Sequence, residues 1–178
     1  MSEQANGRPL VILTGPPGAG KSAVGRLLSD RLHASFVDTD AEIEARAGKP
    51  VGDIFLDDGE DAFRSLERTV TGRALDAGGA VVALGSGAVL DPEVQERLAG
   101  QPVAYLSADF GSIAKRLGLD RPRVIIPGNP RGRLRAMLEE RRPVYERLAT
   151  FTVDAGELAP EEIADEIEAW LAEGSPAS

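Results

Sequence analysis

The octapeptide at 15–22, which reads Gly-Pro-Pro-Gly-Ala-Gly-Lys-Ser, constrains this chain more than any other segment. It fits the P-loop pattern G-x-x-x-x-G-K-[ST] and lies between an apolar run at 10–13 and a helical pattern at 23–32. Glycines let backbone N–H groups converge on phosphate oxygens, and the helix start adds the positive end of its dipole. The segment therefore predicts a strand–loop–helix unit that binds nucleotide phosphates, rather than a glycine-rich turn that matches the pattern by chance.

The side chains of this loop suit two further tasks. Lys21 supplies a mobile positive charge to the outer phosphates, and the Ser22 hydroxyl can ligate Mg²⁺. ATP and Mg²⁺ are therefore the expected cofactors. The residues predicted to contact the nucleotide are Gly18, Ala19, Gly20, Lys21, Ser22 and Ala23.

The composition excludes several classes of protein. With 178 residues, of which 42% are hydrophobic and 28% charged, the chain suits one globular domain with a largely aliphatic core. A net charge of −9 argues against a nucleic-acid-binding surface, and the absence of cysteine excludes disulfides and thiol chemistry. The polar segment 1–8 lacks the apolar centre of a signal peptide, and no apolar stretch approaches membrane-spanning length. We expect a cytoplasmic protein with no nucleic-acid or membrane partner.

Apolar runs and helical patterns alternate along the chain. The five apolar runs are 10–13, 35–37, 80–84, 103–106 and 151–153. This alternation predicts a single α/β domain with a doubly wound parallel sheet, in which binding sites lie beyond the carboxyl ends of the strands. The last residues, 174–178, are expected to form a disordered tail.

Proline and glycine interrupt the helical pattern at 119–130, a segment that also carries Arg121 and Arg123. A loop of this length inside a compact α/β domain is more often functional than idle. We interpret it as a mobile lid that closes over the nucleotide, with an ordinary surface loop as the alternative.

Two carboxylates, Asp38 and Asp40, follow the second apolar run. A P-loop site needs a carboxylate for the magnesium shell, and phosphoryl transfer to a hydroxyl needs a group that orients the hydroxyl and accepts its proton. We assign Asp38 to the magnesium shell and Asp40 to the acceptor hydroxyl. The alternative is that one of them caps a helix starting near Ala41, and Asp40 could serve in both ways.

Three arginines and one glycine turn are ambiguous from the residues alone. Arg64 and Glu67 are i, i+3 neighbours on a predicted helix and can pair, either as an ordinary surface pair or to aim the guanidinium at an anionic ligand. The same two alternatives apply to Arg141 and Arg142. The turn Gly-Ser-Gly at 85–87 either presents backbone N–H groups to a ligand or simply ends a strand.

From about residue 9 to residue 171 the chain resembles the shikimate kinase family. The matching features are the loop 15–22, Asp38-Thr39-Asp40 with Ile43-Glu44, Asp53-Ile54-Phe55, Gly59-Glu60 with Phe63-Arg64 and Glu67, the turn 85–87, and Arg141 near Pro143 and Tyr145. The resemblance implies one P-loop kinase domain over 1–178, with three layers as in nucleoside monophosphate kinases and strand order 2-3-1-4-5. It also implies two mobile insertions, a helical substrate-binding region at about 34–78 and the lid at about 119–130.

The resemblance further implies ATP-dependent phosphorylation of the 3-hydroxyl of shikimate, a step of aromatic amino acid biosynthesis, by a monomeric enzyme. Asp40 would bind the ring hydroxyls and accept the proton, while Arg64 and Arg141 would hold the carboxylate. Arg123 would reach the ATP phosphates and act with Lys21 and Asp40 in catalysis. The other residues expected beside the substrate are Phe55, Phe63, Ser86 and Gly87.

Three positions depart from the family pattern. Ser86 stands where the family usually has the second of three glycines, Val124 where the lid usually has a proline, and the run 155–157 where an arginine often lies near adenine. Ser86 would crowd the substrate or add a hydrogen bond. The loss of the proline at position 124 would loosen the lid, and the missing arginine would weaken or alter the contact with adenine. The alternative function is therefore a P-loop kinase for another small hydroxy acid or polyol, and two basic clamps favour an acid.

Overall fold

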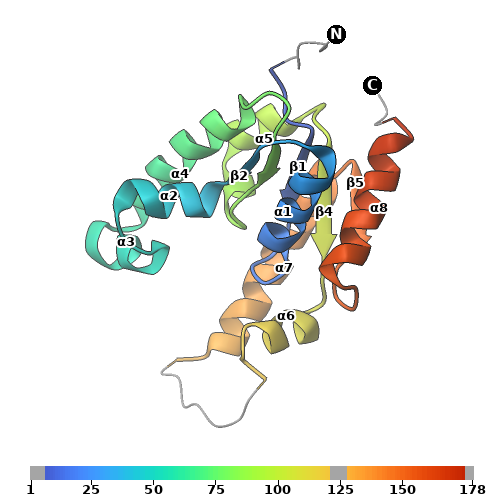
Figure 1. Ribbon diagram of the computed structural model, residues 1–178. Helices are drawn as coiled ribbons and strands as arrows, with labels where there is room; N and C mark the ends of the chain where they lie inside the picture. Colours follow the sequence, from blue (N-terminus) through green and yellow to red (C-terminus); the bar gives the residue numbers. More distant parts are fainter. Residues whose placement is uncertain (1–6, 121–127, 175–178) are drawn as a thin grey trace.

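A five-stranded parallel sheet forms the centre of the molecule (Figure 1). The computed structural model describes residues 7–120 and 128–174. The strands are β1 (Val11–Thr14), β2 (Phe36–Asp38), β3 (Val81–Ala83), β4 (Val103–Ser107) and β5 (Phe151–Asp154). They lie in the order β2-β3-β1-β4-β5, which confirms the fold class and the strand order expected for this chain.

Some expectations concern residues outside this described part. Arg121, Arg123 and Val124 of the expected lid lie between the two described ranges, and 175–178 of the expected tail lie beyond them. The lid and tail assignments therefore stay predictions.

Helices surround the sheet: α1 (Lys21–Leu32), α2 (Thr39–Ala47), α3 (Val51–Asp58), α4 (Glu60–Leu75), α5 (Pro92–Leu98), α6 (Phe110–Arg116), α7 (Pro130–Leu148) and α8 (Pro160–Ala172), with a 3-10 turn η1 (Ala88–Leu90) after β3. Local chemistry fixes several helix starts. Asp91 accepts a hydrogen bond from the Glu93 N–H at 2.9 Å and precedes Pro92, the first residue of α5. No helix in the described part has the length and apolar character needed to span a bilayer.

Alternation along the strands places helices on both faces of the sheet. Val11 and Leu13 of β1 pack in a hydrophobic cluster with α1 and α8, whereas Ile12 belongs to a second cluster with α4, α5 and the end of α7. Both faces are thus buried, which explains why the strands read as short continuous apolar runs. The three-layer arrangement holds the carboxyl ends of β1, β2 and β3 at one edge of the sheet.

Helices α2, α3 and α4 form an arm that extends away from the sheet beside β2 (Figure 1). The arm has its own small hydrophobic cluster, whose buried members are Ile43, Ile54, Phe63 and Val70. At the end of α4, Leu75 instead packs in the sheet's second cluster and so anchors the arm. The arm falls within the region 34–78, whose role in binding substrate stays a prediction.

Candidate active site

The P-loop connects the end of β1 to the start of α1 in a conformation that requires glycine. Gly15 has φ 149° and passes so close to β4 that an added Cβ would lie 2.6 Å from the carbonyl oxygen of Leu106. Gly20 has φ 95° and immediately precedes Lys21, the first residue of α1. The loop therefore lies at the N-terminus of a 12-residue helix, where free backbone N–H groups favour anions.

Lys21 folds back over this loop. Its Nζ donates hydrogen bonds to the carbonyl oxygens of Gly15 at 2.8 Å and Pro16 at 2.9 Å. Burial lowers the pKa of Lys21 from 10.5 to about 8, although the nearby carboxylates of Asp40 and Asp38 act in the opposite direction. The ammonium group is thus held at the loop but is poorly solvated, and an anion at the loop would supply the charge that it lacks.

Asp38 links the loop to the arm through both of its carboxylate oxygens. Oδ2 accepts a hydrogen bond from the Ser22 hydroxyl at 2.5 Å, while Oδ1 accepts the N–H groups of Asp40 at 3.1 Å and Ala41 at 3.3 Å. Asp38 is therefore the N-cap of α2, which begins at Thr39. The alternative that one of the two carboxylates caps this helix is confirmed for Asp38, whereas Asp40 lies within the first turn of α2 and does not cap it.

The Ser22 and Asp38 oxygens fit a magnesium ion. They are hard donors, they lie side by side at the phosphate loop, and Mg²⁺ is usually bound by one or two protein groups together with water and substrate phosphates. Within 7–120 and 128–174 no group of three or more His, Cys, Asp or Glu side chains is arranged to hold a metal by itself. The ion would therefore depend on bound phosphates for its remaining ligands.

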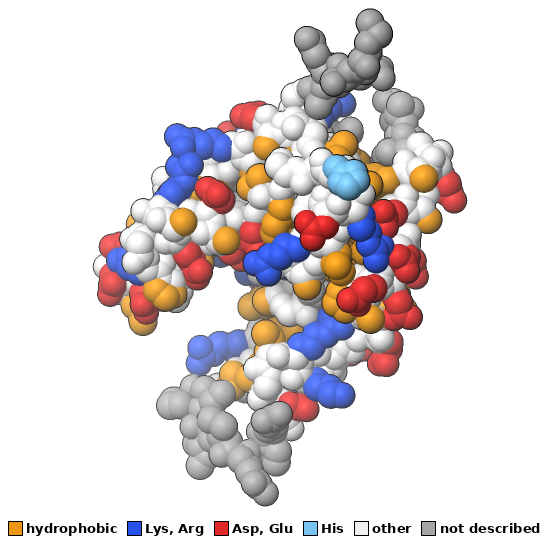
Figure 2. All heavy atoms as spheres, viewed as in Figure 1, with side chains coloured by type: hydrophobic (Ala, Val, Ile, Leu, Met, Phe, Trp, Pro, Cys, Tyr) orange, Lys and Arg blue, Asp and Glu red, His pale blue; other side chains and the backbone are white. Residues whose placement is uncertain are grey.

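A cavity of about 320 Å³ opens over the P-loop. Lys21, Ser22, Asp38 and Asp40 line it, together with Ser86 of the turn after β3. Partial burial raises the pKa of the Asp40 carboxyl, an effect opposed by Lys21 and reinforced by Asp38. The space-filling view shows that the molecule is hollowed between the arm and the ends of α6 and α7 (Figure 2).

A second cavity, of about 190 Å³, lies between the arm and α7. Arg64 of α4 and Arg141 of α7 both line it, as do the rings of Phe55 and Phe63, whose centroids are 4.5 Å apart. The Arg64 guanidinium lies 5.3 Å from the Phe63 centroid. The cavity thus combines two cations with an aromatic wall, a combination suited to a small anion with an apolar ring face.

Glu67 holds Arg64 in this position. Its Oε1 accepts a hydrogen bond from Arg64 Nη1 at 2.7 Å, and the Glu67 side chain is only 6% exposed. Burial raises the pKa of Glu67, and the hydrogen bond and positive charge of Arg64 oppose this rise. The i, i+3 pair is therefore part of the cavity wall and not a solvated surface pair.

The turn at 85–87 passes between the two cavities. An added Cβ at Gly85 would lie 2.6 Å from Asp40 Oδ1, and one at Gly87 would lie 2.8 Å from Arg64 Nη1. The Gly85 N–H donates to the Thr39 hydroxyl at 2.9 Å, so this amide is used within the protein. Asp40 and Ser86 line both cavities, which places a carboxylate and a hydroxyl where the cavities meet.

Sequence reasoning placed some residues less well. Arg142 lies apart from Arg141 and lines a different hollow, with Tyr105 and Asp154. Sequence reasoning also missed Arg116 of α6, which donates to the carbonyl oxygens of Gly18 at 3.0 Å, Ala155 at 2.5 Å and Gly156 at 3.1 Å. The sequence did contain a signal for Arg116, which is an arginine in the last turn of the helix that follows β4. That helix ends beside the P-loop. Tyr145 and Thr39 were also not assigned roles, although both bind the turn at 85–87.

Comparison with known proteins agrees with this geometry. A family model described as "SKI: Shikimate kinase" matches residues 17–172. Shikimate kinase of Thermobifida fusca (strain YX) is 55% identical over 158 residues, which cover 89% of this chain and 92% of that protein. Shikimate kinase of Salinispora arenicola (strain CNS-205) is 43% identical over 164 residues, which cover 92% and 98%. The structure of "Shikimate kinase from Acinetobacter baumannii in complex with shikimate" matches with a TM-score of 0.84 and 31% identity over 95% of each chain. The chain therefore belongs to the shikimate kinase family.

Proposed function

We propose that this chain transfers the γ-phosphoryl group of ATP to the 3-hydroxyl of shikimate, giving ADP and shikimate 3-phosphate. The observation that carries the proposal is that the P-loop cavity and the two-arginine cavity meet at Asp40 and Ser86. A phosphoryl donor and a hydroxylated acid bound in these cavities would face each other across Asp40. Family membership, and the Acinetobacter baumannii relative's complex with shikimate, support shikimate as that acid.

At the nucleotide end, the residues of the loop act by binding and by charge. The amides at the start of α1 bind phosphate oxygens, and Lys21 exchanges its two carbonyl acceptors for the transferred phosphoryl group. Ser22 and Asp38 would hold Mg²⁺, which when bound supplies further positive charge to the phosphates. Arg123, expected to contact the same phosphates, lies outside the described residues and stays a prediction.

At the acceptor end, Asp40 prepares the hydroxyl. The 3-hydroxyl oxygen forms a bond to the γ-phosphorus while the bond from that phosphorus to the β–γ bridging oxygen breaks, and Asp40 accepts the hydroxyl proton. Its raised pKa makes Asp40 a stronger proton acceptor than an ordinary carboxylate, and the charge of Lys21 keeps it ionised. Arg64 and Arg141 fix the acid end of the ring, so catalysis consists mainly of positioning and electrostatic stabilisation.

The identity of the acceptor is tested by direct product analysis. The chain is incubated with ATP and Mg²⁺ and, in separate reactions, with shikimate, gluconate or nucleoside monophosphates, and the products are identified by mass spectrometry. Shikimate 3-phosphate as the main product supports the proposal, whereas preferential phosphorylation of another hydroxy acid or polyol would favour the alternative kinase.

The monomeric state and the cytoplasmic location stay predictions, which sedimentation and cell fractionation test.

Removing either arginine of the second cavity should weaken acceptor binding selectively. Arg64→Ala and Arg141→Ala are each expected to raise the KM for shikimate about 10- to 100-fold, because a charge-assisted contact to the carboxylate is lost. The KM for ATP should change less than about twofold, since neither side chain lines the P-loop cavity. Arg142→Ala, on the same helix but in a different hollow, is the matched control. Equal rises in both KM values would remove these arginines from the carboxylate site.

The lowered pKa of Lys21 makes nucleotide affinity dependent on pH. Because the free protein loses this charge as the pH rises through about 8, and phosphates bind the charged form, affinity is highest well below pH 8 and falls as the pH rises through that value. Between pH 7.5 and pH 9 the Kd of a non-hydrolysable ATP analogue should rise roughly tenfold. Calorimetric titration measures this change, and Lys21→Met should bind weakly with no such dependence. A wild-type Kd that stays constant to pH 9.5 would contradict the assignment.

A further inference from the structure

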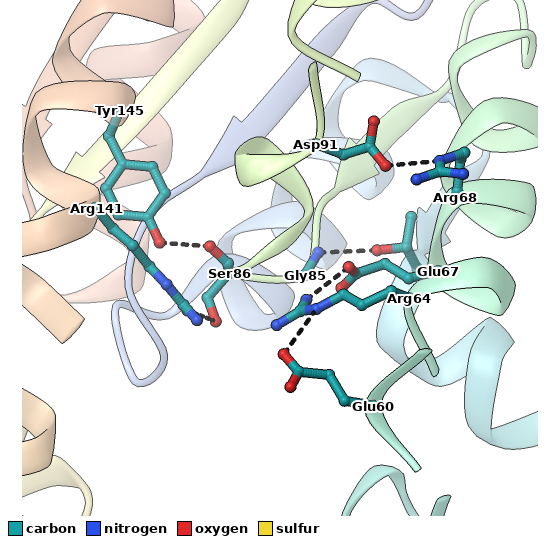
Figure 3. Close-up of polar contacts among 10 residues, drawn as sticks. Glu60, Arg64, Glu67, Arg68, Gly85, Ser86, Asp91, Arg141 and Tyr145 are labelled. Atoms are coloured by element: carbon teal, nitrogen blue, oxygen red, sulfur yellow. Dashed lines mark hydrogen bonds and ion pairs between the residues drawn. The ribbon is translucent and has the colours of Figure 1, made fainter. Parts of the chain in front are cut away.

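Helix α7 holds Ser86 at two points. Arg141 Nη1 donates a hydrogen bond to the Ser86 hydroxyl oxygen at 3.1 Å, and the Tyr145 hydroxyl donates to the Ser86 carbonyl oxygen at 2.6 Å (Figure 3). Arg141 and Tyr145 are four residues apart and therefore lie on one face of α7. One helix face thus binds both the side chain and the main chain of a single residue in the turn.

Tyr145, which anchors this turn on α7, is buried and packed against a second aromatic ring. Tyr145 is 1% exposed, its ring stacks on Tyr105 with centroids 5.2 Å apart, and burial raises the pKa of its hydroxyl to about 12. The hydroxyl therefore remains a donor at every pH at which the protein would be assayed. The Ser86 backbone is consequently fixed relative to α7, and its side chain has a defined place from which to meet Arg141.

Of the three positions in the 85–87 turn, position 86 is the one that accommodates a side chain. A Cβ at Gly85 would collide with the Asp40 carboxylate, and a Cβ at Gly87 would collide with the Arg64 guanidinium. Ser86 avoids both groups, and its hydroxyl reaches the other arginine of the cavity instead. The serine that departs from the usual three-glycine pattern therefore adds a contact rather than crowding the cavity.

The two arginines of the cavity differ in how they are held. Arg64 is paired with Glu67 at 2.7 Å, whereas in the described part of the chain Arg141 forms no ion pair, and its buried Nε has no hydrogen-bond partner. The Ser86 hydroxyl is a neutral acceptor for Nη1 of the Arg141 guanidinium. A neutral partner orients the guanidinium while leaving its full charge for an incoming carboxylate, which a glutamate partner would partly neutralise.

We propose that Ser86 is a positioning residue that presets the Arg141 guanidinium for the carboxylate of the acceptor. The proposal rests on the function proposed above, because it assigns the acid end of shikimate to this cavity. A preset arginine loses less side-chain freedom when the acid binds, so the benefit appears in acceptor affinity and not in the chemical step. Because the side-chain contact that Ser86 makes is to Arg141, its removal should change the affinity for the acceptor rather than the affinity for the nucleotide.

Steady-state kinetics of three variants test this role. Ser86→Ala and Ser86→Gly should raise the KM for shikimate about three- to tenfold, with kcat and the KM for ATP within about twofold of the wild type. Ser86→Thr keeps the hydroxyl and should restore the KM to within about twofold of the wild type. An unchanged KM for shikimate in Ser86→Ala would overturn the proposal.

A double-mutant cycle separates positioning from direct contact. In the Arg141→Ala background, Ser86→Ala should cause no further change in the KM for shikimate, because the group that Ser86 positions is already gone. The same three- to tenfold rise in that background would show that Ser86 acts on the substrate independently and would overturn the inference. Failure of the proposed function looks different, because the wild-type chain would then not phosphorylate shikimate at all.

Discussion

The Lys21→Ala variant is expected to lose about 1,000-fold or more in kcat. The ammonium group already lies at the loop, where its Nζ contacts the carbonyl oxygens of Gly15 and Pro16. In phosphoryl transfer it would neutralise charge that accumulates on the transferred group, and alanine leaves that charge unopposed in a poorly solvated cavity. A coupled ADP-release assay under saturating shikimate and ATP measures the loss.

Lys49→Ala is the matched control for this variant. Lys49 lies between α2 and α3 and forms exposed ion pairs with Asp57 and Asp58 at the end of α3, and none of the three lines the P-loop cavity. Such pairs contribute little, so kcat should stay within about twofold of the wild type. Near-normal turnover by Lys21→Ala, with both variants folded by circular dichroism, would end the assignment of phosphoryl transfer to this loop.

The Asp40→Asn variant should lose about 100- to 10,000-fold in kcat while both KM values change much less. Asparagine has nearly the same shape as aspartate, but its amide cannot accept the hydroxyl proton. In the wild type, kcat should also fall at acidic pH as Asp40 becomes protonated, and its raised pKa moves this fall to higher pH than for an ordinary aspartate. The variant should show no such acid limb.

Glu42→Gln provides the comparison on the same helix. Glu42 is exposed on α2 and lines a separate small groove with Arg46 and Arg73, so its neutralisation should leave kcat and its pH profile unchanged. If Asp40→Asn instead retained kcat within about threefold, the proton would have to leave by another route, and Asp40 would be reduced to a binding group.

The sequence allowed the strand–loop–helix conformation of the nucleotide half to be predicted, whereas the contacts of its residues with a nucleotide stay predictions. The loop 15–22 is a continuous segment whose geometry is set by its own glycines and by the strand and helix that flank it, so local pattern was sufficient. The apolar run at 10–13 corresponds to β1 at Val11–Thr14, and the other four runs also fall on strands. The strand order came from the family resemblance, because alternation alone does not say on which side of its neighbour each strand lies.

The acceptor half was harder to predict, because its contacts join distant segments. Ser86 and Arg141 are separated by 55 positions, and only the packing of α7 on the sheet brings them together. The choice between Arg141 and Arg142 depends on the rotation of α7, which a neighbouring pair of arginines does not reveal. The assignment of Asp38 to the magnesium shell stays a prediction. Which of the two carboxylates caps α2 could not be decided from the sequence, because it depends on where that helix begins.

The separate hydrophobic cluster of the arm has a consequence for the divergence of such enzymes. Its buried members Ile43, Ile54, Phe63 and Val70 are distinct from the clusters that hold the sheet to its other helices. Substitutions that remodel the wall facing the acceptor are therefore absorbed within the arm, without disturbing the packing beneath the P-loop. The acceptor specificity of such an enzyme can therefore change during evolution while its nucleotide-binding half is retained.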